Sequence, residues 1–293
     1  MAEPIFAPYV PTYANRTPYI TPAEFSSAGT GVNVSQIIPG ASTVANADAL
    51  AQIIARASSI ADDFCHQVLA ATVDTVSGAY RVQRDGTLKV SAPFTPVVSV
   101  NQIQLGREPS ALTELSDLSK VWIDQKIITI PLAGFQARGG YWSRPDRMFA
   151  VIQYVNGWAN TLTTDAVGKS TSVIPVLSTV GIAPGMQMTV YDIGNGQSEQ
   201  IIVASTTDTT ITTATPLSFV HDTGVAVSAL PPFVKQAVVH ITAGLIKSRG
   251  VQAIVMPPLG QQPKQETGYG ATGTGKAEMD RAAQLLAPIV RTW

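Results

Sequence analysis

The sequence contains little cysteine and little charge. Its 293 residues include one cysteine, Cys65, and 13% charged residues, against about 25% in an average globular domain. One thiol excludes an intrachain disulfide and a zinc site built from several thiolates, and it fits a reducing cytoplasm. With 45% hydrophobic residues, the composition also excludes a highly charged disordered chain.

An excess of either charge sign is also missing. Nineteen Lys and Arg residues balance twenty Asp and Glu residues, giving a net charge of -1. A dedicated nucleic-acid-binding protein normally carries a strongly basic surface, because neutralised phosphates supply most of its affinity. We therefore expect no sequence-specific binding to nucleic acid.

No hydrophobic run is long enough to suggest a membrane segment. The most apolar stretch, 233–246, is interrupted by Lys235 and His240 and is too short to span about 30 Å of hydrocarbon. No basic region followed by an apolar run opens the chain, as a signal peptide would. The sequence predicts a soluble, unexported protein with no membrane partner.

Residues 1–40 show neither helical nor strand periodicity but are rich in proline and aromatic residues. Such a segment cannot form a core of its own. It is either an extended arm that places aromatic rings in pockets of another subunit or a flexible end, and both alternatives remain open. On the first alternative, the candidate interface residues are Tyr9, Tyr13 and Tyr19.

The rest of the chain predicts an α+β fold with three main helices and a β-layer. Periodic apolar residues predict helices over 46–66, with Asn46 as N-cap, over 233–247, and over 276–287. Alternating or β-branched runs predict strands over 79–84, 87–90, 97–105, 121–124, 127–131 and 148–155. Asp85-Gly86 predicts a type I′ hairpin turn between the first two strands.

Residues 161–230 are rich in Thr, Val, Ser and Gly and show no helical pattern. Four short strands, over 186–193, 199–204, 209–213 and 225–229, predict an inserted all-β subdomain, sandwich-like or barrel-like. The predicted organisation is an arm (1–40), a core (41–160 plus 231–293), the insert (161–230), and a mobile Gly- and Pro-rich loop within the C-terminal part (257–275).

One motif matches a known phosphate-binding pattern. Residues 270–276 fit G-x-x-x-x-G-K, but Ala277 stands where the P-loop needs a Ser or Thr hydroxyl. The residues before it, 261–268, are polar and contain proline, whereas a P-loop follows a buried strand. We therefore expect no nucleotide binding.

The remaining reactive side chains form no recognisable active site. Cys65 lies on the apolar face of its helix, Asp62 and Asp63 are expected on the solvated face, and no two histidines share a metal-ligand spacing. His240 is expected to pack and His221 to lie in a turn. We predict no catalytic, cofactor-binding or metal-binding residue, and no enzymatic activity.

Several phrases of the sequence occur in an order that resembles the head-to-tail connector family of tailed bacteriophages, also called adaptor or head-completion proteins. They cover roughly 18–160 and 230–293, and the insert departs from the compact form of the family. The phrases are PYITPAEF (18–25), DFC (63–65), YRVQRDG (80–86), VSAPFTPVVSV (90–100), VIQYVNGW (151–158), LPPFVKQAV (230–238) and AQLLAP (283–288).

The resemblance implies a structural protein of the virion neck, assembled in the host cytoplasm. Such proteins form a ring, usually dodecameric, that docks on the portal protein and continues the DNA channel towards a tail-completion or tail-tube protein. Double-stranded DNA would pass without sequence-specific binding, and the insert would project as a decoration. We assign portal contact to 251–293, with Arg281, Arg291 and Trp293 as anchors, and expect truncation after Gly250 to leave a folded protein.

Two other functions remain open at this point. The chain is alternatively another virion protein, such as a tail-completion or capsid-decorating subunit. From a different class, it is a small hydrolase or carbohydrate-binding module that uses Trp142 or Trp158 with Asp124.

Overall fold

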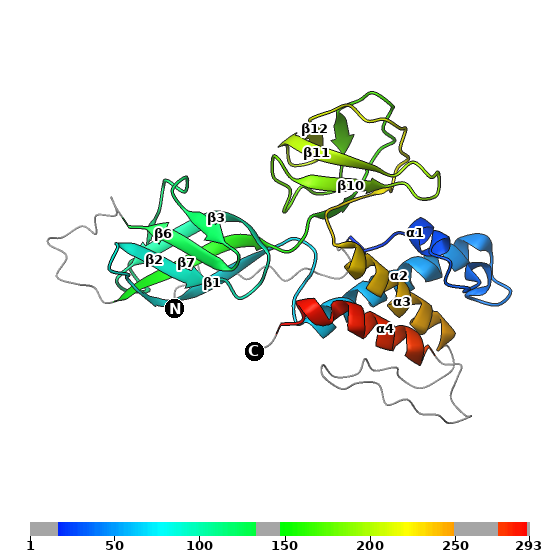
Figure 1. Ribbon diagram of the computed structural model, residues 1–293, viewed down its shortest axis with the longest axis horizontal. Coiled ribbons are helices and arrows are strands. Elements are labelled where there is room, and N and C mark those ends of the chain that lie inside the picture. Colours follow the sequence, from blue (N-terminus) through cyan, green and yellow to red (C-terminus); the bar gives the residue numbers. More distant parts are fainter. Residues whose placement is uncertain (1–16, 133–146, 249–274, 292–293) are drawn as a thin grey trace. The chain divides into compact units, whose positions relative to one another are not determined.

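The computed structural model describes residues 17–132, 147–248 and 275–291 (Figure 1). It contains 26% helix and 33% strand, with a curled all-antiparallel sheet, so the predicted α+β class is confirmed at this level. Within the described ranges, no helix combines the length and apolarity needed to cross a membrane.

The described residues fall into two compact units, and the division differs from the predicted one. One unit contains the described residues between 71 and 158, which are 71–132 and 147–158, and the other combines 17–70 with the described residues from 159 onwards. The predicted core of 41–160 plus 231–293 is therefore split, because 71–158 surrounds a hydrophobic cluster of its own. The predicted insert belongs to the same unit as the helices.

The first unit is built entirely from antiparallel strands. β1 pairs with β7 over ten residues without a break, from Thr72↔Asn156 to Arg81↔Arg147. The four-stranded sheet has the order β1-β7-β3-β4 and the three-stranded sheet the order β2-β6-β5. The strands are β1 (Thr72–Arg81), β2 (Thr87–Ser91), β3 (Val97–Gly106), β4 (Thr113–Glu114), β5 (Trp122–Asp124), β6 (Ile127–Pro131) and β7 (Arg147–Asn156).

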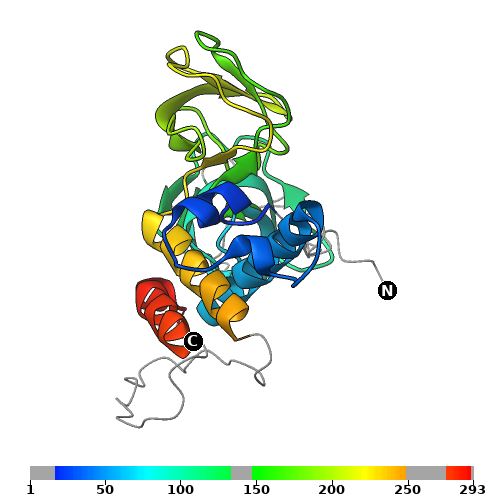
Figure 2. The same ribbon diagram turned by 90° about the vertical axis from the view of Figure 1, so that its right-hand side faces the viewer.

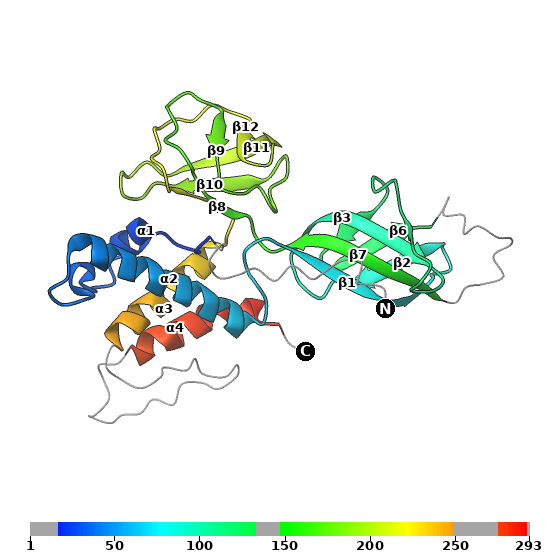
Figure 3. The same ribbon diagram turned by 180° about the vertical axis from the view of Figure 1, so that it is seen from behind.

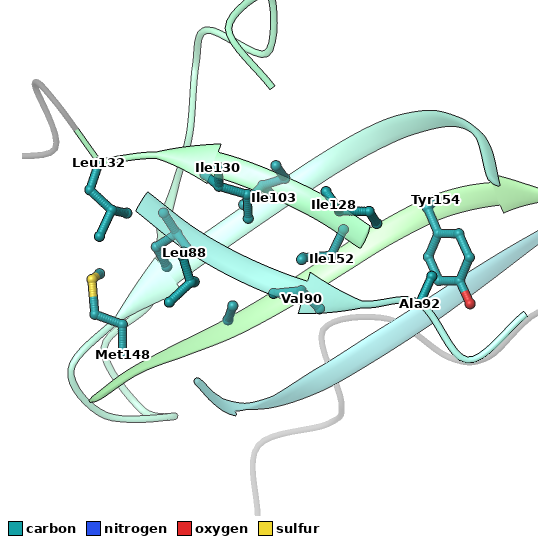
Figure 4. Close-up of a cluster of buried hydrophobic side chains, with 12 residues drawn as sticks. Leu88, Val90, Ala92, Ile103, Ile128, Ile130, Leu132, Met148, Ile152 and Tyr154 are labelled. Carbon is teal, nitrogen blue, oxygen red and sulfur yellow. The ribbon is translucent and has the colours of Figure 1, made fainter. Parts of the chain in front are cut away.

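A cluster of aliphatic side chains fills the space between these strands (Figure 4). Leu88 and Val90 on β2 meet Ile128 and Ile130 on β6, and Ile152 on β7 closes the cluster; all five are fully buried. Because side chains alternate along a strand, every second residue of β2 and β6 enters this core. This cluster is therefore the hydrophobic core of the first unit.

The turn between β1 and β2 is not the predicted type I′ turn. Gly86 has a φ of +78°, but Asp85 does not have the positive φ that type I′ also requires. Gly86 N donates to Gln83 O at 3.1 Å, and the Asp85 carboxylate accepts from Thr87 N at 3.0 Å. The aspartate therefore stabilises the turn through its side chain, with only the glycine in the left-handed region.

The second unit contains the helices, at nearly the predicted positions. α2 packs against both α3 and α4, and α3 packs against α4; Figure 2 shows the red α4 alongside the orange α3. The N-cap of α2 is Ser42 rather than Asn46, whose buried amide instead accepts from Ile38 N at 2.7 Å. The helices are α1 (Pro22–Ser27), η2 (Val34–Gln36), α2 (Thr43–Cys65), α3 (Pro232–Lys247), α4 (Lys276–Leu286) and η3 (Ala287–Ile289).

The described part of the N-terminal segment, 17–40, folds onto the helices of its own chain. Thr21 and Glu24 form a reciprocal capping box at the start of α1, which the pattern Thr21-Pro-Ala-Glu24 would have predicted. Tyr19, Ile20 and Phe25 are almost fully buried. Residues 1–16 of the predicted arm lie outside the described residues.

Residues 159–230 form a sheet with the order β8-β13-β10-β11-β12-β9. A bridge between Thr163 and Val176 joins its two ends, so the sheet closes into a barrel (Figure 3). Its core is aliphatic. Two of its strands, β8 and β9, were not predicted from the sequence. The strands are β8 (Asn160–Leu162), β9 (Val173–Pro175), β10 (Gln187–Tyr191), β11 (Glu199–Thr206), β12 (Thr210–Thr213) and β13 (Ala226–Ser228).

Candidate functional site

The structure describes residues 275–291 of the predicted portal-contact segment, which include α4. Two glycines allow α4 to approach α3 closely. Gly275 has a φ of +74°, and a Cβ there would lie 2.4 Å from Gly244 O. A Cβ at Gly244 would in turn lie 3.1 Å from Gly275 O. The second glycine of the G-x-x-x-x-G-K match therefore has a structural explanation, since it starts α4 against the backbone of α3.

Polar side chains of α3 and α4 form a mixed-charge surface, which is the candidate interaction site. Lys247 Nζ donates to Glu278 Oε1 in an ion pair that joins the two helices, and Gln236 Nε2 lies 3.2 Å from His240 Nε2. Burial lowers the pKa of His240, and the positive charges of Arg281 and Lys247 add to this against the opposing effect of Glu278. Arg281 itself is exposed.

The structure separates the predicted interface residues into three groups. Arg281 is exposed on α4, and Arg291 is half-buried, with its backbone N 3.3 Å from Cys65 O. Tyr9, Tyr13 and Trp293 lie outside the described residues. Tyr19 is 0% exposed and is therefore not available as a surface anchor, which corrects its predicted role.

Tyr19 belongs to a buried hydrogen-bond cluster with α2. Its hydroxyl donates to Asp62 Oδ1 and accepts from Leu69 N and Ala70 N, each at 3.1 Å. Leu69 N also lies 2.8 Å from Asp62 Oδ1. Asp62 is thus buried rather than solvated, because it binds the chain that follows its own helix, whereas Asp63 is exposed as predicted.

A second buried cluster surrounds Lys235 and was not predicted from the sequence. Lys235 Nζ on α3 lies 2.6 Å from Glu24 Oε1 and 3.8 Å from the centroid of the Tyr191 ring on β10. Burial lowers the pKa of Lys235, and the Glu24 carboxylate opposes that shift. Lys235 appears in the sequence as an interruption of an apolar helix, which is the one signal that a partner was needed.

A third cluster surrounds His221 in the barrel. His221 is buried rather than exposed in a turn, with Nδ1 3.1 Å from Asp192 Oδ2 and Nε2 2.8 Å from Glu199 Oε1. Glu199 also accepts from Ser218 N and Phe219 N. Burial opposes ionisation of Glu199, but its hydrogen bonds from Ser218, His221 and Phe219 outweigh burial and lower its pKa.

These clusters hold segments of the chain together, and none has the layout of a hydrolytic centre. Both nitrogens of His221 already face carboxylates, so no hydroxyl nucleophile can use it as a base. Burial, reinforced by Asp62, raises the pKa of Cys65 to about 12, so this thiol is not a nucleophile at neutral pH. Across the part of the chain that the structure describes, no group of three His, Cys, Asp or Glu residues is arranged to hold a metal.

The residues of the carbohydrate alternative are only partly described. Asp124 is exposed at the end of β5, Trp158 is half-buried, and Trp142 lies outside the described residues. Comparison with known proteins adds no further candidate: no protein-family model and no curated protein matches the chain.

Proposed function

We propose that the chain is a head-to-tail adaptor of a tailed bacteriophage, a structural protein of the virion neck that assembles into a ring on the portal vertex. One observation carries the proposal. The connector-like phrases at 63–65, 230–238 and 283–288 fall at α2, α3 and α4, which pack together although they are far apart in sequence. If the three phrases matched the family only by chance, there would be no reason for them to fall on helices that contact one another.

In this proposal α2, α3 and α4 are the three-helix adaptor core. Residues 71–158 provide the β-layer, and 159–230 are the inserted barrel. The ring is dodecameric, as is usual in the family that the sequence resembles. Its partners are further copies of the chain, the portal protein on one side and a tail-completion or tail-tube protein on the other.

The charge balance supports a channel rather than a nucleic-acid-binding site. Duplex DNA carries one negative charge per about 1.7 Å of its axis, so a strongly basic lining would bind it and hinder its passage. The chain has a net charge of -1. DNA in this proposal is a passing neighbour and not a bound ligand.

The segment that this proposal assigns to assembly on the portal, 251–293, includes the exposed Arg281 on α4. The packing of α4 on α3 through Gly244 and Gly275, with Met279, Ala282 and Leu286 buried, corrects one expectation from the sequence. Truncation after Gly250 removes all of these contacts, so it would destabilise α3 and could not report on portal binding alone. A surface substitution is the better probe.

Electron microscopy of the full chain mixed with the portal protein from the same genome tests this function. We expect a ring coaxial with the portal, weakened by Arg281→Glu and unaffected by Arg56→Glu, a matched exposed arginine on α2. A wild-type chain that binds the capsid lattice or the tail tube, and not the portal, would replace the adaptor with a decorating or tail-completion subunit. A chain that binds no virion component would overturn the proposal.

A further inference from the structure

An apolar strip lies on the outside of the barrel along β9. Ile174 and Val176 are each 1% exposed, whereas Val173 and Leu177 are 49% and 57% exposed. Because successive side chains of a strand point to opposite faces, Val173, Pro175 and Leu177 share the outer face. Large aliphatic side chains therefore follow one another along the surface of this strand.

The strip continues across the closure of the barrel onto β8. Leu177 N donates to Leu162 O at 3.0 Å, and the bridge Thr163↔Val176 sets a register in which Leu162 lies opposite Leu177. Directly opposite residues in an antiparallel pair present their side chains on the same face. The half-exposed Leu162 thus widens the strip. We call Leu162, Val173, Pro175 and Leu177 the seam strip.

Acidic residues flank the seam strip on both sides. Asp165 follows Thr164, whose N donates to Pro175 O at 3.1 Å, and Asp208 precedes Thr209, whose carbonyl accepts from Val176 N at 2.8 Å. Both aspartates are exposed. The barrel as a whole contains five acidic residues and one basic residue, Lys169, so its formal charge is 1 − 5 = −4.

The opposite combination occurs at the end of α4. Ala287 and Pro288 are exposed, Leu285 and Ile289 are half-buried, and the exposed Arg281 lies one helical turn before Leu285. The described residues 281–291 contain two basic residues, Arg281 and Arg291, and no acidic residue. We call 285–289 together with Arg281 the α4 end. It offers apolar surface beside positive charge.

We propose that the seam strip of one subunit docks on the α4 end of the next subunit. This inference rests on the proposed ring and specifies a contact within it. The two surfaces come from different parts of the chain, so the contact is heterologous, as a closed ring with more than two subunits requires. Two seam strips facing each other would instead bring Asp165 and Asp208 against their own copies, and like charges disfavour that pairing.

Two variants of the full chain test the contact. Each is half-blocked, meaning that one of the two proposed surfaces is disrupted and the other is kept. Val173→Asp/Leu177→Asp removes the seam strip and keeps the α4 end, whereas Arg281→Glu/Ala287→Glu does the reverse. In sedimentation velocity up to about 1 mM protein, we expect wild type to associate and each variant alone to associate at least about tenfold more weakly. An equimolar mixture should form a 1:1 dimer that grows no further, because only one complementary pair of surfaces remains.

Matched controls separate the contact from general surface effects. Ile202→Asp places the same charge at another exposed aliphatic residue of the barrel, 45% exposed on β11, and Lys276→Glu reverses an exposed charge at the other end of α4. Both should associate like wild type. Thermal unfolding of every variant establishes that it is folded.

The outcomes for the contact and for the ring can be told apart. If wild type associates, or forms a ring on the portal, and the seam-strip variant does so equally well, the proposed contact is wrong while the ring remains. A mixture of half-blocked variants that does not pair, although wild type assembles, also overturns the contact. If wild type assembles neither alone nor on the portal, the contact and the proposed function fail together.

Discussion

Lys235 and Glu24 form a buried ion pair, with Nζ 2.6 Å from Oε1 and side chains that are 8% and 4% exposed. The pair joins α1 to α3, and the ammonium group also lies 3.8 Å from the centroid of the Tyr191 ring in the barrel. Three segments that are far apart in sequence therefore meet at one lysine. Burying two charges is unfavourable unless they stay paired. The charged side chains of Lys235 and Glu24 can therefore be buried only when α1 and α3 are packed in this way.

Replacing Lys235 alone should strongly destabilise the protein. Lys235→Met leaves the Glu24 carboxylate buried without its partner, and breaking a buried pair on one side costs about 3–5 kcal/mol. Lys235→Met/Glu24→Gln removes both charges and should lose less than the single substitution. Urea unfolding of both variants measures this; a double variant as unstable as the single would show that the charge pairing is not what matters.

Tyr19→Phe should destabilise the helical unit by about 1–3 kcal/mol. The substitution removes the hydroxyl that links Asp62 with Leu69 N and Ala70 N, and an unsatisfied buried group costs about this much. Tyr80→Phe removes a half-buried hydroxyl in the other unit and serves as the control. Equal losses for both variants in urea unfolding would contradict the role assigned to Tyr19.

Gly275→Ala should cost more than Gly196→Ala. Both glycines have positive φ, +74° and +66°, but only Gly275 also lies against backbone, with a Cβ position 2.4 Å from Gly244 O. Positive φ alone costs about 1 kcal/mol for an alanine, so any additional loss at Gly275 measures the close approach of α3 and α4. The free energy of unfolding of both variants is the readout, and similar losses would argue against close packing at Gly244.

Acid should weaken the barrel through Glu199. Its folded pKa lies below the ordinary value of 4.5, so the stability from its ionised form is complete above pH 4.5 and is lost as the pH falls through the lowered folded pKa. Unfolding midpoints between pH 7 and pH 3 should therefore fall less steeply for Glu199→Gln than for wild type. Glu114→Gln on the exposed β4 is the control, and a wild-type-like slope for Glu199→Gln would refute the assignment.

The positions of most elements followed from local sequence patterns. The helices at α2, α3 and α4, and the strands β2, β6, β10 and β11, were predicted to within a few residues, because each is long or regular enough for its hydrophobic period to show. Pro232 at the start of α3 marked its boundary in the same way. The strands that were missed, β4, β8 and β9, have two or three residues each and depend on partners elsewhere in the chain. β1 begins at Thr72, seven residues before the predicted start at residue 79.

Which polar residues would be buried was decided only by tertiary structure. Tyr19 lies in a Pro-rich segment without periodicity, and Asp62 sits beside another aspartate on a helix, so neither had a local signal for burial. Tyr19 and Asp62 bind each other and are 43 residues apart in sequence. Lys235 and Glu24 are 211 residues apart. Side chains at such separations come together only once the elements have packed.

The sequence by itself determined the three long helices, most of the longer strands, the charge balance and the lack of a motif with complete catalytic spacing, because these depend on residues that are close in the chain. The tertiary structure decided that 71–158 forms its own unit and that β8 and β9 close the barrel. It also decided that the residues of the seam strip lie on the outer surface of the barrel. Those properties depend on strand register and on which face of each element is covered. The hydrophobic period of a segment predicts that one face of the helix or strand is buried. Which elements pack against that face, and whether the opposite face is also covered, is determined only by the tertiary structure.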